Sequence, residues 1–241
     1  MPDSVNSIYQ TRYENKDYIV KEYGPLVSTL CRRMIEDREG ARDAAQEVWI
    51  EVLKSLPVFR GESKLSTWIT VIAKRTISRW TEKERLYSYR EINIGCRNPI
   101  LPPVEEWGGE DPERLDLWTR LICDICLTSI LHCLEPETRF IFILRTVLQM
   151  DYRQISEIMG ITYSAVRQRY SRAVRKLSNF GKSDCVLLNP DGPCRCAQNV
   201  FLEQTTLIEE FSKLRKTVDL METWLNAEKV FPGINYWKEM L

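Results

Sequence analysis

Residues 164 to 175 gather hydroxyl, amide and guanidinium groups at the spacing of one helix face. Groups of these types read DNA, because arginine pairs with guanine edges, glutamine pairs with adenine edges, and further cations bind phosphates. The residues on this face are Ser164, Arg167, Gln168, Ser171, Arg172 and Arg175. Apolar residues at helical spacing, from Val166 to Leu177, occupy the other face and predict packing on a core. The segment is therefore a candidate for a helix that lies in the major groove.

The residues just before this face have the pattern of a helix-turn-helix. Asp151 and Gln154 form a capping-box pattern at the start of a first helix. Gly160 suits the left-handed conformation that ends a helix, and Thr162 can cap the next one. A basic helix alone is equally well explained as a solvated face of a bundle. The capped first helix and the glycine corner favour DNA binding.

A second basic segment, PVFRGESKLSTWITVIAKRTISRW, covers residues 57–80. Its cations are Arg60, Lys64, Lys74, Arg75 and Arg79. Leu65, Trp68, Ile69 and Ile72 form a helical core stripe, with Thr67, Thr70, Lys74 and Ser78 opposite. The loop before this helix has Gly61 as its pivot, and a polar loop beside a basic helix can hold an extruded base and its phosphates. The alternative is an ordinary exposed helix with Trp68 in the core.

Three cysteines, Cys185, Cys194 and Cys196, lie around a Pro/Gly turn near the end of the chain. Thiolates bind zinc and other metals, but zinc prefers four ligands and this loop offers three. A metal site, a thiol redox sensor and a plain structural loop all remain open. Beyond the loop, apolar residues from Leu207 to Leu225 follow a heptad seam of nearly three repeats.

Helices are expected to position all of these groups, because apolar residues recur at helical spacing and no strand pattern is evident. Residues 17–87 read as helices, with Gly40 separating the first two, and residues 114–180 form a second helical block. Between them, residues 88–113 hold four prolines and three glycines, which is linker composition. An amphipathic helix is expected at 203–227. The predicted fold class is all-α, with two helical domains, a flexible linker and a Cys-containing helical extension.

The composition limits the function classes. The chain has 241 residues, with 34 Lys and Arg against 34 Asp and Glu, so only local patches can attract nucleic acid. No run of about 18 apolar residues predicts a membrane span, and the N-terminus lacks signal-peptide features, so a cytoplasmic protein without membrane insertion is expected. One histidine and the lack of phosphate-loop or nucleophile motifs argue against an enzyme, and no cofactor is required.

Two segments together resemble a known family. DAAQEVW and LPVFRGESKLSTWI, within residues 23–80, look like region 2 of extracytoplasmic-function sigma factors, the group 4 sigma-70 relatives of bacterial RNA polymerase. YRQISEIMGIT and VRQRYSRAVRKL, within residues 134–177, resemble their region 4. The resemblance implies a region 2 bundle in residues 1–87, a linker in 88–113 and a region 4 helix-turn-helix in 114–180. Residues 181–241 have no counterpart in the two-domain family, and a regulatory role is expected for them.

The resemblance also implies partners and site residues. Asp43, Gln46 and Glu47 would contact the clamp helices of core RNA polymerase, and the helix at 137–148 would contact the flap. The face on residues 164–175 would read the minus-thirty-five element of promoter DNA. Residues expected to melt and hold the minus-ten element are Arg60, Gly61, Ser63, Lys64, Lys74, Arg75 and Arg79. An anti-sigma factor is a further expected partner.

The alternative from another class is an autonomous helix-turn-helix regulator that binds duplex operators as a dimer. The heptad seam at 207–225 favours this reading, because it could join two copies. The paired match to two domains argues against it.

Overall fold

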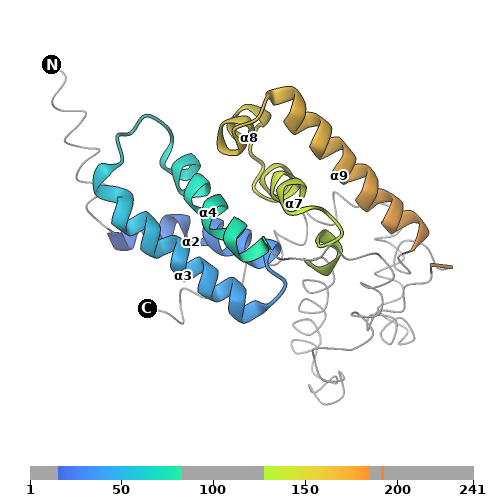
Figure 1. Ribbon diagram of the computed structural model, residues 1–241, viewed down its shortest axis with the longest axis horizontal. Helices are drawn as coiled ribbons and strands as arrows, with labels where there is room; N and C mark the ends of the chain where they lie inside the picture. Colours follow the sequence, from blue (N-terminus) through green and yellow to red (C-terminus); the bar gives the residue numbers. More distant parts are fainter. Residues whose placement is uncertain (1–15, 83–127, 185–190, 193–241) are drawn as a thin grey trace, which may run out of the picture.

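The computed structural model describes residues 16–82, 128–184 and 191–192 (Figure 1). Within these ranges every regular element is a helix, which confirms the predicted all-α class. None of the described helices is long and apolar enough to cross a membrane. The linker at 88–113 and nearly all of the extension lie outside the described residues.

The first group of helices comprises α2 (Lys16–Met34), α3 (Arg38–Ser55), the short 3-10 helix η1 (Leu56–Val58) and α4 (Leu65–Thr81). The three α-helices pack on one another around a closed apolar core. Its buried residues include Val27, Leu30, Ala44, Val48, Val52, Ile69 and Ala73. On α4, Leu65 and Ile69 are buried and Trp68 is half-buried against the core, as the stripe predicts.

The boundary between α2 and α3 differs from the prediction. Gly40 was expected to separate the two helices, but it lies buried in the first turn of α3. Asp37 makes the break, because its carboxylate accepts the Gly40 backbone N–H at 2.6 Å and caps α3. A Cβ on Gly40 would lie 3.2 Å from the Trp80 ring. The glycine therefore permits close packing rather than ending a helix.

The second group begins with a helical turn at residues 128–131 and continues as α7 (Pro136–Phe142). A five-residue π-helix, η2 (Ile143–Val147), extends α7 directly. Gln149, in the left-handed conformation at φ 54°, ends it, and the Met150 N–H reaches the Leu144 carbonyl at 2.9 Å. Then come α8 (Tyr152–Met159) and α9 (Tyr163–Ser183). Residues 137–147 of the predicted 137–148 are thus helical, with Leu148 as the C-cap, and the second half is wider than an α-helix.

The two groups of helices contact each other directly, as Figure 1 shows for α4 beside α8. Helix α8 packs on α4, and α7 contacts both α2 and α4. Thr67 and Thr70, placed by the sequence on the face of α4 away from the core stripe, are buried. The reason is that α4 is covered on a second side by α7 and α8.

Candidate nucleic-acid interface

The helix-turn-helix corner is built by local hydrogen bonds, as the sequence predicts. Asp151 accepts the backbone N–H groups of Arg153 and Gln154 at 2.8 and 2.9 Å. The Gln154 side chain accepts the Asp151 N–H at 3.2 Å, which completes the capping box. Gly160 ends α8 at φ 67°, and Thr162 caps α9 by accepting the Ala165 N–H at 3.2 Å. The bounds of α8 and the start of α9 are therefore set by local side-chain caps and by the left-handed glycine between the two helices.

An aromatic cluster supports α9 from beneath. The ring of Tyr170 stacks on Phe142 at 6.1 Å and meets Tyr152 edge-on at 5.8 Å. Its hydroxyl lies 3.3 Å from the Thr146 hydroxyl in η2. The Arg145 guanidinium lies 4.8 Å above the Tyr152 ring, where a cation–π contact is favourable. These contacts hold the inner face of α9 and leave its outer face available.

Two cations of α9 are used inside the domain. Arg169 pairs with Glu137 of α7, and Lys176 donates to the Cys133 carbonyl at 2.6 Å. Both residues lie off the face that the sequence assigned to DNA. Arg169 and Lys176 thus stabilise the packing of α9 on its own domain, whereas the cations of the predicted DNA-reading face point outward.

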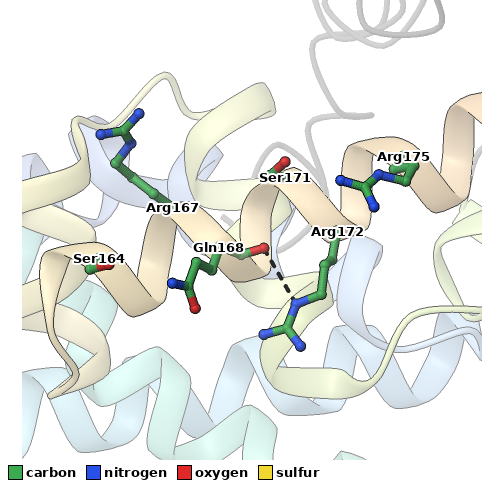
Figure 2. A pocket seen from close by; sticks show the side chains of 6 residues that line it. All are labelled: Ser164, Arg167, Gln168, Ser171, Arg172 and Arg175. Atoms are coloured by element: carbon green, nitrogen blue, oxygen red, sulfur yellow. Dashed lines mark hydrogen bonds between the residues drawn. The ribbon is translucent and has the colours of Figure 1, made fainter.

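The predicted DNA-reading face is exposed along its whole length, and its six residues line one open hollow of about 530 Å³ (Figure 2). They form two rows with four-residue steps. One row is Ser164, Gln168 and Arg172, and the other is Arg167, Ser171 and Arg175. Within this face the Arg172 Nε donates to the Gln168 carbonyl at 3.4 Å. The arrangement presents three guanidinium groups, an amide and two hydroxyls to a single ligand surface.

Tyr163 extends this face and was missed by sequence reasoning. Its side chain is 45% exposed, and the Arg167 guanidinium lies 5.9 Å from its ring. Its position directly after the cap Thr162 was the available signal, because the first turn of such a helix approaches the bases. Tyr163 is therefore an additional candidate contact.

The loop before α4 is open and polar. Arg60, Gly61, Ser63 and Lys64 are all exposed, and Gly61 has φ 70°, a conformation that favours glycine. Arg60 and Glu62 approach to 3.9 Å, but both side chains are more than three-quarters exposed, so this pair adds little stability. The loop is anchored at its start, where the Phe59 ring lies 4.9 Å from Trp68.

The three predicted DNA-binding cations of α4 have different surroundings. Arg75 is exposed. Arg79 is exposed too, but it pairs with the Glu47 carboxylate at 3.5 Å. Lys74 is half-buried, and its ammonium donates to the carbonyl of Met159 in α8 at 3.1 Å. Lys74 is thus engaged by the other group of helices, which the sequence did not predict.

The outer face of α3 holds the predicted polymerase-binding residues. Asp43 and Gln46 are exposed, and Glu47 is half-buried because it accepts the Trp80 indole N–H at 3.1 Å. Ile50, one turn further along the same face, is 50% exposed. An exposed isoleucine on a polar helix face is a candidate contact that sequence reasoning missed. The sequence signal was that Ile50 follows Glu47 by three residues, which places both on the same face of a helix.

The predicted cysteine site at Cys185, Cys194 and Cys196 lies outside the described residues. In the part that the structure describes, no group of His, Cys, Asp or Glu side chains could hold a metal ion. Cys31 and Cys133 are both buried, and burial raises the pKa of the Cys31 thiol to about 12. A thiol with such a pKa stays protonated and unreactive at neutral pH.

Comparison with known families decides the identity of this arrangement. Residues 19–86 match the family described as Sigma-70 region 2. Residues 124–177 match Sigma-70, region 4. The chain belongs to the sigma-70 family. The matched ranges contain the loop with α4 in one case and the helix-turn-helix in the other, so both predicted DNA-binding surfaces lie in family segments.

The curated relatives are RNA polymerase sigma factors. The chain is 28% identical over 182 residues to RNA polymerase sigma factor YlaC of Bacillus subtilis, covering 75% of this chain and 94% of that protein. It is 27% identical over 174 residues to the ECF RNA polymerase sigma-E factor of Haemophilus influenzae, covering 67% and 84%. These relatives confirm the extracytoplasmic-function identification made from the motifs.

A structural comparison finds the solved structure of CnrH in complex with the cytosolic domain of CnrY. Its TM-score is 0.48 at 17% sequence identity, and the match covers 68% of this chain and 86% of that one.

As a sigma factor, the chain directs transcription initiation, and its family implies core RNA polymerase and promoter DNA as partners. The autonomous dimeric regulator is not favoured. The individual site residues and the domain boundaries at 1–87, 88–113, 114–180 and 181–241 stay predictions.

Proposed function

We propose that this sigma factor reads the minus-thirty-five element through the exposed face of α9 and performs no chemistry of its own. The observation that supports this best is the six-residue face, which presents donors and cations from two aligned rows. Arg167 and Arg172 can pair with guanine edges or phosphates, and Gln168 can pair with adenine. Tyr163 adds a contact at the end of the face that is nearest the cap.

The loop Phe59–Lys64 and the exposed edge of α4 are proposed to melt and hold the minus-ten element. An exposed loop with a left-handed glycine can fit closely around an extruded base. Arg75 and Arg79 supply cations further along α4, in its second half, as binding to the backbone of single-stranded DNA requires. The half-buried Trp68 supports the loop through Phe59 and does not act as a stacking platform for a base.

The outer face of α3 is proposed to dock on the polymerase clamp helices. Asp43 and Gln46 provide exposed polar groups, and Ile50 provides apolar area at the centre of the contact. Apolar side chains surrounded by polar groups are typical of protein interfaces. The segment from 137 to 148 is proposed to contact the flap.

Residues 181–241 are proposed to regulate initiation in the cytoplasm. Cys185, Cys194 and Cys196 would hold zinc or another metal, or would respond to oxidants, and the seam at 207–225 would transmit the change. An anti-sigma factor is proposed as a second regulator, which would cover the surfaces that contact polymerase.

Run-off transcription with purified core polymerase tests the proposal. Wild-type chain should start transcription from promoters that carry both elements, and the chain without polymerase should not bind those duplexes specifically. Specific duplex binding by the chain alone, with no transcription when core enzyme is added, would contradict it.

A further inference from the structure

A series of ring contacts links the core of region 4 to the start of α9. The buried Phe142 ring stacks on Tyr170, and Tyr170 meets the ring of Tyr152 edge-on at 5.8 Å. Tyr152 in turn meets the ring of Tyr163 at 5.8 Å, with the two planes 79° apart. Edge-to-face pairs at such centroid distances are favourable. The Tyr163 ring is therefore held in a defined position, although it is partly exposed and belongs to the first residue of α9.

The guanidinium of Arg167 lies over this ring, one helical turn further along α9. Its central carbon is 5.9 Å from the centroid of the Tyr163 ring, within the range in which a cation–π contact is favourable. An exposed arginine side chain samples many rotamers, and a contact of this kind reduces the number that it occupies. The ring thus gives a preferred direction to Arg167, which is exposed in the predicted DNA-reading face.

An aromatic ring can orient an arginine without using up its hydrogen-bond donors. The ring attracts the cation through its quadrupole, whereas a carboxylate binds the N–H groups themselves, often two at a time. Arg169 shows the contrast, because it pairs with the Glu137 carboxylate and is committed to the packing of α9 on α7. Arg167 keeps its N–H groups for an outside ligand. Two adjacent donors of a guanidinium match the O6 and N7 acceptors of guanine in the major groove.

The position of the pair in α9 agrees with base reading. In a helix-turn-helix, the N-terminal residues of the second helix contact base edges. Tyr163 follows the cap Thr162 directly, so the pair occupies the start of α9. Figure 2 shows Arg167 on the edge of the helix opposite Gln168 and Arg172. A change in the orientation of Arg167 should therefore affect reading at its own base pair and leave the base pairs of the other row unaffected.

We propose that Tyr163 is a positioning residue that orients the Arg167 guanidinium toward one guanine of the minus-thirty-five element. The inference rests on the proposed function, because it needs the face of α9 to read that element. Whatever contact the Tyr163 ring itself makes with DNA, its effect on sequence selectivity passes through Arg167. An exposed cation–π contact corresponds to a factor of about 2–5 in an equilibrium constant, so removal of the ring should lower the preference for this guanine by that factor.

Selection by holoenzyme from a duplex library tests the assignment. The library is randomised over both promoter elements, and the bound duplexes are sequenced to give the preference at each base pair. Arg167→Ala should lower the preference for one guanine by about 5–150-fold, which identifies the guanine that Arg167 reads. Tyr163→Ala should lower the preference for the same guanine by about 2–5-fold, and Tyr163→Phe, which keeps the ring, should retain it. Replacing this guanine by 7-deazaguanine, which lacks N7, should abolish the difference between wild type and Tyr163→Ala.

A double-mutant cycle separates positioning from direct contact. In the Arg167→Ala background, Tyr163→Ala should cause no further loss at this guanine, because no guanidinium is left to orient. Arg167→Lys keeps the charge but not the fork, so it should lower the preference for guanine and leave the salt dependence of binding unchanged. Tyr18→Ala is the matched control, because it removes another partly exposed tyrosine, in α2, and should change neither quantity.

Three results would overturn the positioning role. The first is a guanine preference that is lost in Arg167→Ala but unchanged in Tyr163→Ala. The second is additive losses in the double variant, or a loss in Tyr163→Ala at a different base pair, since either would mean that Tyr163 contacts a base directly. The third is equal losses at the base pairs read by Gln168 and Arg172, which would mean that Tyr163→Ala loosens the whole corner. Wild-type binding that ignores every base pair of the minus-thirty-five element would contradict the proposed function itself, and the inference with it.

Discussion

The guanidinium of Arg139 lies 2.9 Å from Nδ1 of His132, and both side chains are buried. Arginine can only donate, so the ring nitrogen must accept and the imidazole is held neutral. Burial, and then the charge of Arg139, lower the pKa of His132 from 6.5 to about 3. A proton on His132 would therefore break its contact with Arg139, whose guanidinium also donates to the Met34 carbonyl of α2 at 2.7 Å.

The first prediction is that the folded chain loses stability as the pH falls below about 6.5. Between that pH and about 3 the unfolded chain binds a proton at His132 that the folded chain does not. The free energy of unfolding should then decrease by up to about 1.4 kcal/mol per pH unit from this group. Urea unfolding at pH 7, 6 and 5 measures the slope. His132→Asn keeps an acceptor but cannot take a proton, so a slope equal to that of the wild type would contradict the assignment.

The second prediction compares two left-handed residues at helix ends. Gly160→Ala should destabilise the chain by about 1 kcal/mol, because φ 67° strains any side chain although the space around it is open. Gln149→Gly should stabilise it by about 0.5–1 kcal/mol, because Gln149 already carries that strain at φ 54°. Thermal unfolding should show shifts of opposite sign. Melting-temperature shifts of the same sign in both variants would mean that side-chain contacts of these residues, rather than their backbone conformation, decide the effect.

The caps were predictable because they depend on residues a few positions apart. The caps of α8 and α9 involve groups that lie within one helical turn of each other, and their residues are Asp151, Gln154, Gly160 and Thr162. The sequence therefore determined both the corner and the exposed face of α9. The same reasoning failed at Gly40, where a glycine was interpreted as a break. Asp37 had already fixed the helix start, and the glycine serves packing against Trp80.

The contact between the two groups of helices was not predictable from periodicity. Arg139 and Met34 are 105 residues apart in the sequence, and the residues around each of them do not indicate that the two will be in contact. Thr67 and Thr70 look like an exposed polar face, and they are buried only because a second group of helices covers α4. Polar residues give no periodic signal for burial of this kind.

The third prediction concerns the cysteines of the extension. If Cys185, Cys194 and Cys196 hold a metal or sense oxidants, initiation by the wild type should depend on chelator or oxidant. The variant with all three changed to serine should lose this dependence. Transcription with and without chelator, together with mass spectrometry of the native chain, measures it. Cys31 and Cys133 provide the internal control, since buried thiols should resist alkylation in the folded chain. Absence of bound metal combined with indifference to oxidants would rule out the regulatory site.

The fourth prediction concerns the loop before α4. The combined change Arg60→Ala and Ser63→Ala should slow promoter opening and alter minus-ten preference, because both exposed side chains are proposed to hold the displaced strand. The equilibrium constant for closed-complex formation should stay within about twofold of the wild-type value, since the proposed contacts to duplex DNA lie on α9. Permanganate footprinting reports the bubble. Lys54→Ala, an exposed cation of α3, is the control. A normal bubble on every promoter variant would refute the role of the loop.

The fifth prediction separates base reading from phosphate binding on α9. Arg167→Ala, Gln168→Ala and Arg172→Ala should each weaken holoenzyme binding to a minus-thirty-five-dependent promoter by about 1–3 kcal/mol. Thermal stability should not change, because these side chains lie off the buried face. Each arginine variant that loses a phosphate contact should also reduce the slope of log affinity against log salt by about one, whereas Gln168→Ala should leave the slope unchanged.

Lys182→Ala is the matched control for this series, because Lys182 is an exposed cation in the last turn of the same helix and lies outside the six-residue face. Binding is measured from 50 to 200 mM salt on two promoters that differ only in the minus-thirty-five element. The loss should be confined to the promoter that carries the element. Equal losses on both promoters would mean that α9 contributes charge but no sequence reading, and unchanged binding in all three variants would remove this face from the promoter contact.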